Sequence, residues 1–260
     1  MDFADDIALL SDTSEKMQKK TTKLAEIAEK VGLQISHEKN KVMRNAICSN
    51  NNNSIQLGEQ MIEEVTQFTY LGSCIDQNGE LKKEIQTRIA KAATAFRALG
   101  KIWTSKILST KTKLRIFNSN IISILIYACE CWKVTREIEN RLNSFENKCL
   151  RKILQIKWNE FKTSQEVRET SGQPLISDVI RRRRWKYIGH VCRRDNSRIT
   201  KQALNWEAEG KRKRGRPRET LKRTILREAE RVGLESMDEV VAAAQNRKEW
   251  RKTLEALCDV

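Results

Sequence analysis

The chain has 260 residues, of which 50 are Lys or Arg and 34 are Asp or Glu, so its formal net charge is +16. Hydrophobic residues make up 39% of the sequence, enough to build a core for one large or two small domains and too many for a disordered tail. With 32% charged residues and a mean hydropathy of −0.63, we expect no transmembrane helix. The first ten residues contain three Asp and no basic residue, so we expect no secretory signal either.

The first 75 residues have the pattern of short strands and one helix. Residues 3–11 predict two apolar strands joined by a turn at Asp5-Asp6. A helix follows, capped by Thr13 or Ser14 and closed by Gly32. Further short strands are predicted over residues 33–36, 41–47, 54–57, 60–65 and 67–75.

After Asn78-Gly79 the apolar spacing changes from the period of a strand to that of a helix. The apolar residues from Ile85 to Trp103 predict one long helix. Ser236 and Glu239 have the spacing of a capping box, which predicts the start of the last helix. Further helices are predicted over about 110–132, 136–157, 177–194, 198–206, 219–233 and 237–257. We therefore expect an α+β chain that is mostly helical.

The seven cysteines are scattered through segments with apolar periodicity, and their number is odd. We expect free thiols in a reducing compartment rather than a disulfide framework. Two close pairs occur, Cys129 with Cys131 and His190 with Cys192. Residues two positions apart on a helix point about 200° from each other, so neither pair forms half of a tetrahedral site. No zinc is expected.

The positive charge is concentrated in one part of the chain. Residues 181–223 contain 17 basic and 4 acidic side chains, a net charge of +13, whereas the rest of the chain adds only +3. Lys and Arg neutralise phosphates and aromatic rings stack on bases, so a basic segment with interleaved Trp185, Tyr187 and Trp206 predicts a nucleic-acid partner. A solvated charged surface is the alternative. The candidate contacts are Arg181, Arg182, Arg183, Arg184, Trp185, Lys186, Arg193, Arg194, Lys211, Arg212, Lys213, Arg214, Arg216 and Arg218.

The sharpest short motif in this segment is Lys211-Arg-Lys-Arg-Gly-Arg-Pro-Arg218. Gly215 and Pro217 exclude a helix there, so the flanking arginines would project from extended backbone. The motif resembles the core of an AT-hook, in which an Arg-Gly-Arg-Pro stretch lies in the narrow minor groove of A·T-rich DNA. A nuclear-import signal, a phosphate-tracking loop and a plain solvated linker are alternative interpretations.

Asp5 and Asp6 are flanked by apolar residues on both sides, and such a pair can simply occupy a turn between strands. The whole string Phe3-Ala-Asp-Asp-Ile-Ala-Leu-Leu-Ser11, however, resembles the palm motif of reverse transcriptases from non-LTR (LINE-type) retrotransposons. The resemblance implies that an Asp at the hairpin tip helps to hold two Mg²⁺ ions, which activate the primer hydroxyl and neutralise the triphosphate of the dNTP. It makes Asp5 the principal metal ligand and Asp6 its companion.

Two further motifs resemble the same family in the same order. Gly32-Leu-Gln-Ile-Ser-His-Glu-Lys-Asn-Lys41 is similar to the next palm motif, with two departures from its usual pattern. The match gives Lys39 the family's basic position, which protonates the pyrophosphate leaving group, with Lys41 as runner-up and a plain surface charge as the alternative. Phe68-Thr-Tyr-Leu-Gly72 resembles the primer-grip hairpin that positions the growing 3′ end, although ordinary strand and core residues would look the same. The residues implied for that role are Phe68, Tyr70, Leu71 and Gly72.

The helical part resembles the thumb of this family, and the end of the chain resembles the C-terminal region of its RTE- and jockey-like group. Tyr127-Ala-Cys-Glu-Cys-Trp132 carries part of the first likeness, and Arg184-Trp-Lys-Tyr-Ile-Gly-His-Val-Cys-Arg193 carries part of the second. The match is collinear over essentially all 260 residues. It implies a short antiparallel palm remnant of reverse-transcriptase type followed by helices. The implied parts are a partial palm over 1–78, a thumb-like helical region over 79–173 and a basic helical nucleic-acid-binding region over 174–260.

The resemblance implies an RNA-directed DNA polymerase that copies an RNA template. A complete enzyme of this kind carries fingers and another metal-binding Asp before the first motif, and neither is found in this sequence. Two-metal transfer needs carboxylates from separate strands, whereas Asp5 and Asp6 come from one turn. We therefore expect a fragment that does not polymerise alone. The alternatives are a non-catalytic nucleic-acid-binding protein, as a decayed or host-recruited copy, and an incomplete gene model.

The expected partners follow from the same resemblance and from the charge. They are an RNA template and DNA, together with dNTP in a complete family enzyme, and no membrane partner is expected. The basic run and the family resemblance predict a nuclear protein that passes through the cytoplasm before import.

Overall fold

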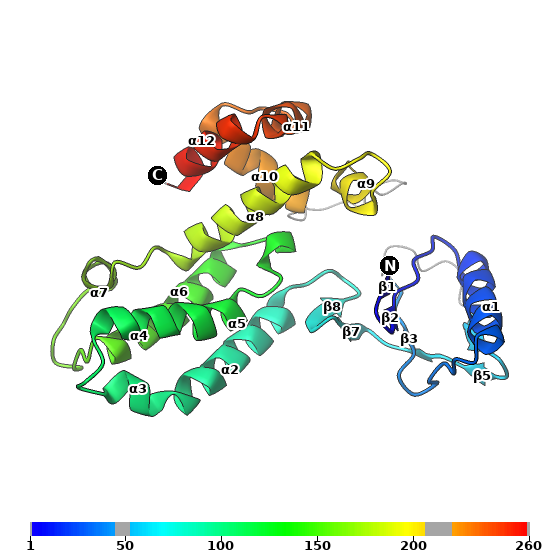
Figure 1. The fold of residues 1–260 in the computed structure, drawn as a ribbon, viewed down its shortest axis with the longest axis horizontal. Coiled ribbons are helices and arrows are strands. Elements are labelled where there is room, and N and C mark those ends of the chain that lie inside the picture. The colour runs from blue at the N-terminus through cyan, green and yellow to red at the C-terminus, as the bar shows by residue number, and fades with distance from the viewer. Residues whose placement is uncertain (1, 45–52, 206–219, 259–260) are drawn as a thin grey trace. The chain divides into compact units, whose positions relative to one another are not determined.

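The computed structural model describes residues 2–44, 53–205 and 220–258, and the chain divides into two compact units, Met1–Glu84 and Ile85–Val260 (Figure 1). All strands of the described residues lie in the first unit, and most helices lie in the second. The α+β class is therefore confirmed. The division lies close to the predicted end of the strand-rich part at residue 78, while the predicted boundary at residue 173 stays a prediction.

The described strands of the first unit form separate two-stranded ladders. The antiparallel pairs are β1 (Asp2–Phe3) with β2 (Asp6–Ile7), β4 (Gln56–Leu57) with β5 (Gln60–Met61), and β7 (Gln67–Tyr70) with β8 (Ser73–Asp76). The remaining pair, β3 (Lys41–Val42) with β6 (Glu63–Glu64), is parallel, contrary to the antiparallel expectation. Residues 33–36 are not a strand, and residues 45–47 of the predicted strand 41–47 lie outside the described part. A reverse-transcriptase palm thus stays a prediction.

Helix α1 (Ser14–Lys30) has the bounds that its sequence predicts. The Thr13 hydroxyl accepts a hydrogen bond from the Lys16 backbone N–H, and Gly32 after the last turn has φ +75°, a conformation that favours glycine. The helix packs on β4, where the Gln18 side chain exchanges two hydrogen bonds with the Gln56 backbone at 2.9 and 2.8 Å. Much of its apolar face, including Ile27, is exposed, so this unit has a thin core.

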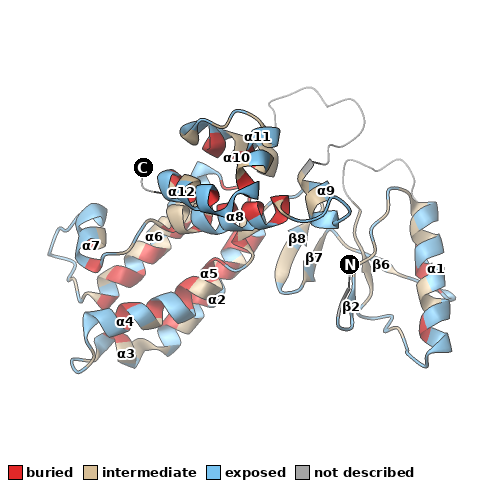
Figure 2. Cartoon of the chain, turned by 45° about the horizontal axis from the view of Figure 1, so that its top comes forward, coloured by how far each residue is buried: buried red, intermediate tan, exposed pale blue. Residues whose placement is uncertain are grey.

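Within its described residues, the regular elements of the second unit are all helices, and this unit holds most of the buried side chains (Figure 2). Helix α8 joins its parts, because it packs against α6, η2, α11 and α12. The helices are α2 (Lys82–Ala98), α3 (Gly100–Thr104), α4 (Thr110–Ile116), the π-helical η1 (Phe117–Ile122), α5 (Ser123–Leu125), the 3₁₀ turn η2 (Cys129–Cys131), α6 (Arg136–Ile153), α7 (Ser164–Ser171), α8 (Ile176–Cys192), α9 (Ile199–Asn205), α10 (Leu221–Ala229), the 3₁₀ turn η3 (Glu230–Val232), α11 (Met237–Gln245) and α12 (Arg247–Cys258).

Several of these helices differ from the sequence prediction. The single helix expected from Ile85 to Trp103 is divided at Leu99 into α2 and α3. The helix expected to reach residue 132 ends at Leu125, and Ala128 then adopts a left-handed conformation with φ +59°. The helix expected over 237–257 is divided by Asn246, whose side-chain oxygen accepts the Lys248 backbone N–H at 3.0 Å and so caps α12. Helix α7 was not expected, although Thr163 and Glu166 form a capping box before it.

Aromatic rings form the centre of the first half of the second unit. Phe96 and Trp103 stack with ring centroids 4.9 Å apart, and Phe117 meets both rings edge-on at 6.1 and 6.5 Å. The Trp103 indole donates to the Phe96 carbonyl at 2.7 Å, so its polar N–H is satisfied inside the core. This cluster fixes α2, α3 and η1 against one another.

A second core surrounds Trp185 of α8 and Trp250 of α12. Their ring centroids are 5.3 Å apart, and the Trp250 indole donates to the Trp185 carbonyl at 3.2 Å. This close approach needs Gly189, because a Cβ at that position would lie 2.2 Å from Trp250 Nε1. The glycine of the Ile-Gly-His string is therefore a packing requirement within a helix.

Gly189→Ala is expected to lower the unfolding free energy by about 1–3 kcal/mol, despite the higher helix propensity of alanine, because the buried Trp250 ring must move and lose its hydrogen bond. Urea unfolding followed by circular dichroism measures this change. Gly100→Ala is the matched control, because no atom lies within 4 Å of its Cβ position, and it should be neutral or slightly stabilising. Equal effects of the two substitutions would contradict the packing argument.

No helix of the described residues is long and apolar enough to cross a membrane. The cysteines of the described part, Cys74, Cys129, Cys131, Cys149, Cys192 and Cys258, are free thiols. Burial raises the pKa of the Cys129 and Cys149 thiols to about 12, so both behave as inert core side chains.

Candidate nucleic-acid interface

One face of α8 carries exposed cations. At 100° per residue, positions 182, 183, 186, 187 and 190 fall within an arc of about 140°, and Arg194, two residues past the end of the helix, contacts His190. These positions are exposed, and no acidic residue occurs between Val179 and Arg194. Tyr187 is the aromatic member of the face, with 38% of its surface exposed. The exposed face of α8 is defined by Arg182, Arg183, Lys186, Tyr187, His190 and Arg194.

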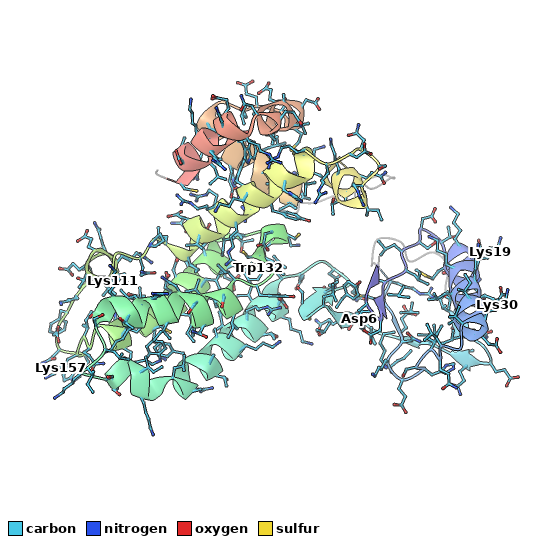
Figure 3. The ribbon with its side chains drawn as sticks, in the orientation of Figure 1. Asp6, Lys19, Lys30, Lys111, Trp132 and Lys157 are labelled. Carbon is cyan, nitrogen blue, oxygen red and sulfur yellow. The ribbon has the colours of Figure 1, made fainter. Side chains whose placement is uncertain are left out.

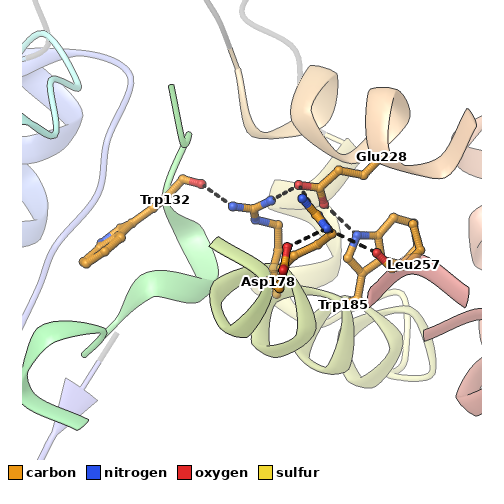
Figure 4. Close-up of polar contacts among 7 residues, drawn as sticks. Trp132, Asp178, Trp185, Glu228 and Leu257 are labelled. Atoms are coloured by element: carbon orange, nitrogen blue, oxygen red, sulfur yellow. Dashed lines mark hydrogen bonds and ion pairs between the residues drawn. The ribbon is translucent and has the colours of Figure 1, made fainter. Parts of the chain in front are cut away.

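The opposite side of α8 places two predicted contact residues in the core. Arg184 is 1% exposed and Trp185 is fully buried. Glu228 of α10 forms an ion pair with the Arg184 guanidinium and accepts the Trp185 indole N–H at 2.7 Å, while Arg184 also donates to the Trp132 carbonyl at 3.3 Å (Figure 4). Because both side chains are buried and contact Glu228 inside the fold, Arg184 and Trp185 do not belong to the interface.

Two more predicted arginines are largely engaged by the protein itself. The Arg181 guanidinium lies 3.0 Å from the Asp178 carboxylate and donates to the Leu257 carbonyl at 3.3 Å (Figure 4). Arg193 is half-buried and donates to the Ala244 carbonyl at 2.8 Å. Arg194 remains exposed and donates to His190 Nε2 at 3.1 Å, so this ring nitrogen is an acceptor.

The remaining predicted contacts of the basic segment lie outside the described residues. They are Lys211, Arg212, Lys213, Arg214, Arg216 and Arg218, together with Trp206. The AT-hook resemblance therefore stays a prediction. Among the described residues, the exposed face of α8 is where the predicted cations gather.

The acidic hairpin forms in the first unit with a shifted turn. Ala4 and Asp5 make the turn, and Asp6 is the first residue of β2, opposite Phe3. Ala4 has φ +51°, which a tight two-residue turn requires. Asp5 and Asp6 are both exposed, so the structure presents two adjacent carboxylates to solvent (Figure 3 labels Asp6).

The predicted primer-grip residues lie beside this hairpin. Phe68 and Tyr70 belong to β7, and Leu71 and Gly72 form its turn with φ +48° and +78°. The Tyr70 hydroxyl donates to the Asp6 carbonyl at 3.4 Å, which brings together two motifs 64 residues apart in sequence. The hydrogen bond is long, so it shows proximity more than stability.

The two candidate lysines have different environments. Lys39 is exposed in the turn over residues 37–39, and Lys41 forms an ion pair with Glu63 across the β3–β6 ladder. Within the described residues no group of three His, Cys, Asp or Glu side chains could hold a metal ion. Asp5 and Asp6 alone do not make up a two-metal site, which takes ligands from separate strands. We derive no catalytic step from them.

Helix α6 carries another group of cations, which the sequence prediction did not single out. Lys148, Arg151 and Lys152 line an open hollow of about 560 Å³ together with Ser144, Asn147 and Ile156. The following loop contains Trp158 and Phe161, with 91% and 90% of their surfaces exposed. Basic residues interleaved with aromatic ones over 148–162 are the sequence signal that could have identified this surface.

Comparison with known proteins gives two matches. The family model described as a domain of unknown function, DUF6451, matches residues 95–127. An uncharacterized transposon-derived protein of Caenorhabditis elegans is 26% identical over 212 residues, which cover 78% of this chain and 75% of that protein. No solved structure matches. This chain is thus similar, over most of its length, to a protein derived from a transposon.

Proposed function

We propose that this chain is a transposon-derived nucleic-acid-binding protein that contacts phosphates through the exposed face of α8. The observation that supports the proposal is the separation of charges on this helix. Arg181 and Arg184 are paired inside the fold, whereas Arg182, Arg183 and Lys186 face solvent, and the acidic residue of this helix, Asp178, is engaged by Arg181. Exposed cations of this kind attract phosphates because binding releases condensed counterions.

The proposal predicts a salt-dependent affinity that this face controls. The triple variant Arg182→Gln, Arg183→Gln, Lys186→Gln should bind an RNA or DNA duplex about tenfold or more weakly. Its plot of log affinity against log salt should lose a slope of about 1 for each cation that contacts a phosphate. Fluorescence anisotropy titrations between about 50 and 200 mM salt measure both quantities.

A matched control removes the same charge from the first unit. Lys19, Lys23 and Lys30 are exposed on α1, where Glu26 lies among them, and Figure 3 labels Lys19 and Lys30. The triple Gln variant at these positions should leave the salt slope unchanged. An α8 variant with the slope of the unaltered chain, or a control variant that flattens the slope equally, would refute the proposed interface.

A second candidate function rests on the first unit. The resemblance to non-LTR reverse transcriptases supports the proposal that the chain descends from an RNA-directed DNA polymerase. The contact of Tyr70 with Asp6 supports it further, because it joins the acidic hairpin to the predicted primer grip. In this proposal Asp5 and Asp6 are remnants of the Mg²⁺ site, Lys39 is the basic residue, RNA and DNA are the partners, and the protein acts in the nucleus.

A further inference from the structure

We propose that a second surface, formed by the hollow beside α6 and the aromatic loop after it, binds single-stranded nucleic acid. The aromatic loop is residues 155–163, between α6 and α7. This inference goes beyond the function proposed for α8 and does not depend on it, since it uses other residues and recognises unpaired bases. It rests on three observations, which are the shape of the hollow, its charge and the exposure of two rings.

The hollow is a shallow depression that is wide open to solvent. Its volume is about 560 Å³, and the polar side chains of Ser144 and Asn147 line it together with the basic ones. An open surface of this kind suits an extended chain better than an enclosed small molecule.

The charge of the hollow and the loop is strongly positive. Residues 148–162 contain five basic side chains and one acidic one, a net charge of +4. In the part of the chain that the structure describes, neither Lys148 nor Lys152 has an acidic partner. The one acidic side chain, Glu160, is turned into its own loop, where it accepts the Lys157 backbone N–H at 3.0 Å and lies 3.7 Å from the Lys162 ammonium. Lys148 and Lys152 are therefore available to an external anion.

Trp158 and Phe161 belong to the loop that follows these cations and are almost fully exposed, at 91% and 90%. The loop is held against α6, because the Arg151 guanidinium donates to the Lys162 carbonyl and the Asn147 amide donates to the Ser164 hydroxyl at 2.9 Å. Trp158 follows Ile156 of the hollow by two residues, so their Cα atoms are within about 7 Å. The loop that carries both rings therefore adjoins the hollow.

Two exposed rings beside unpaired cations match a single strand better than a duplex. Bases of a duplex stack on one another and hide their faces, whereas unpaired bases can stack on Trp and Phe while the cations neutralise the adjoining phosphates. A strand would pass along the hollow with its phosphates near Lys148, Arg151 and Lys152. Exposed aromatic and basic residues can also bind an anionic membrane. The experiment below distinguishes a membrane from a nucleic-acid strand.

The test uses the full chain and a labelled oligo(dT) or oligo(U) strand, compared with a duplex of the same length. The double variant Trp158→Ala, Phe161→Ala should lose about tenfold or more of its affinity for the single strand and keep its affinity for the duplex. Trp158→Phe, which keeps a ring, should retain most of the single-strand affinity. Ile107→Ala is the matched control, because Ile107 is 97% exposed in another loop of the same unit, and it should change neither affinity.

The outcomes separate this proposal from the one for α8. The α8 triple variant tests duplex binding. If that variant binds the duplex normally, a loss of single-strand affinity in the Trp158 and Phe161 double variant still supports the second surface. Unchanged single-strand affinity in the double variant would overturn the inference, as would an equal loss on strand and duplex. Loss of binding to vesicles with anionic headgroups, with oligonucleotide binding intact, would overturn it in favour of a membrane surface. An unchanged melting temperature confirms that each variant is folded.

Discussion

Glu228→Gln is expected to lower the unfolding free energy of the protein by about 3–5 kcal/mol. Glu228 is the acidic partner of Arg184, whose side chain is 1% exposed, and it also accepts the Trp185 indole N–H. A neutral amide at this position can still accept one hydrogen bond, but it removes the negative charge that compensates the buried guanidinium. Removing one partner of a buried ion pair costs more than the pair contributes, because the other charge stays desolvated. Urea unfolding followed by circular dichroism measures the loss.

Two further variants make this prediction specific. Glu230→Gln removes an exposed carboxylate two residues away and should change the unfolding free energy by less than about 0.5 kcal/mol. Adding Arg184→Met to Glu228→Gln removes the stranded charge and should recover part of the loss, so the two substitutions should be non-additive. Similar small effects of Glu228→Gln and Glu230→Gln would show that the contacts of Glu228 with Arg184 and Trp185 do not stabilise the fold.

Glu146→Gln is expected to stabilise the protein at pH 8 by up to about 3 kcal/mol and to have little effect near pH 4.5. Glu146 on α6 is 3% exposed, and burial raises its pKa from an ordinary value of 4.5 to about 7, although the charge of Arg168 and a hydrogen bond from the Ile176 backbone oppose the rise. One of its carboxylate oxygens is buried without a partner.

The sign follows from the direction of this pKa shift. A carboxyl whose pKa is raised by folding stabilises the native state below about pH 4.5, and this contribution is lost as the pH rises towards 7. Gln carries no charge at any of these pH values, so the difference between the variant and the unaltered chain should grow across this window. Urea unfolding at several pH values between 4.5 and 8 measures it. The exposed Glu169→Gln serves as control, and a pH-independent difference for Glu146→Gln would contradict the argument.

The α8 region shows how far sequence reasoning reaches. Its apolar spacing and its run of basic residues predicted a helix over 177–194, and α8 occupies Ile176–Cys192. The same run could not show which arginines are exposed. Arg184 is buried because Glu228, 44 residues later, approaches it from α10. Burying a charge costs free energy unless a partner of opposite charge is buried with it. A partner distant in sequence is brought near only by tertiary packing.

The short strands were harder to predict from the sequence than the helices. Local sequence predicted a strand over residues 67–75, where the primer-grip resemblance implied a hairpin, and the structure has β7 and β8 paired across a two-residue turn. Lys41 pairs with Glu63 in a parallel ladder, and residues 33–36 find no sheet partner in the described part of the chain. Short strands depend on hydrogen bonds to another segment, so local sequence alone does not decide whether they form. The Tyr70 contact with Asp6 is likewise a product of folding.

By itself the sequence determined the α+β class, the bounds of α1, the start of α11 at Ser236 and the concentration of charge over residues 181–223, because capping, periodicity and composition are local properties. Only the tertiary structure decided that Arg184 and Trp185 are core residues, that Gly189 makes room for Trp250, and that Trp158 and Phe161 are exposed in the loop after α6. The physical reason is that a basic or aromatic side chain has the same local signature whether it is buried or exposed. Its burial depends on which distant segments pack against it.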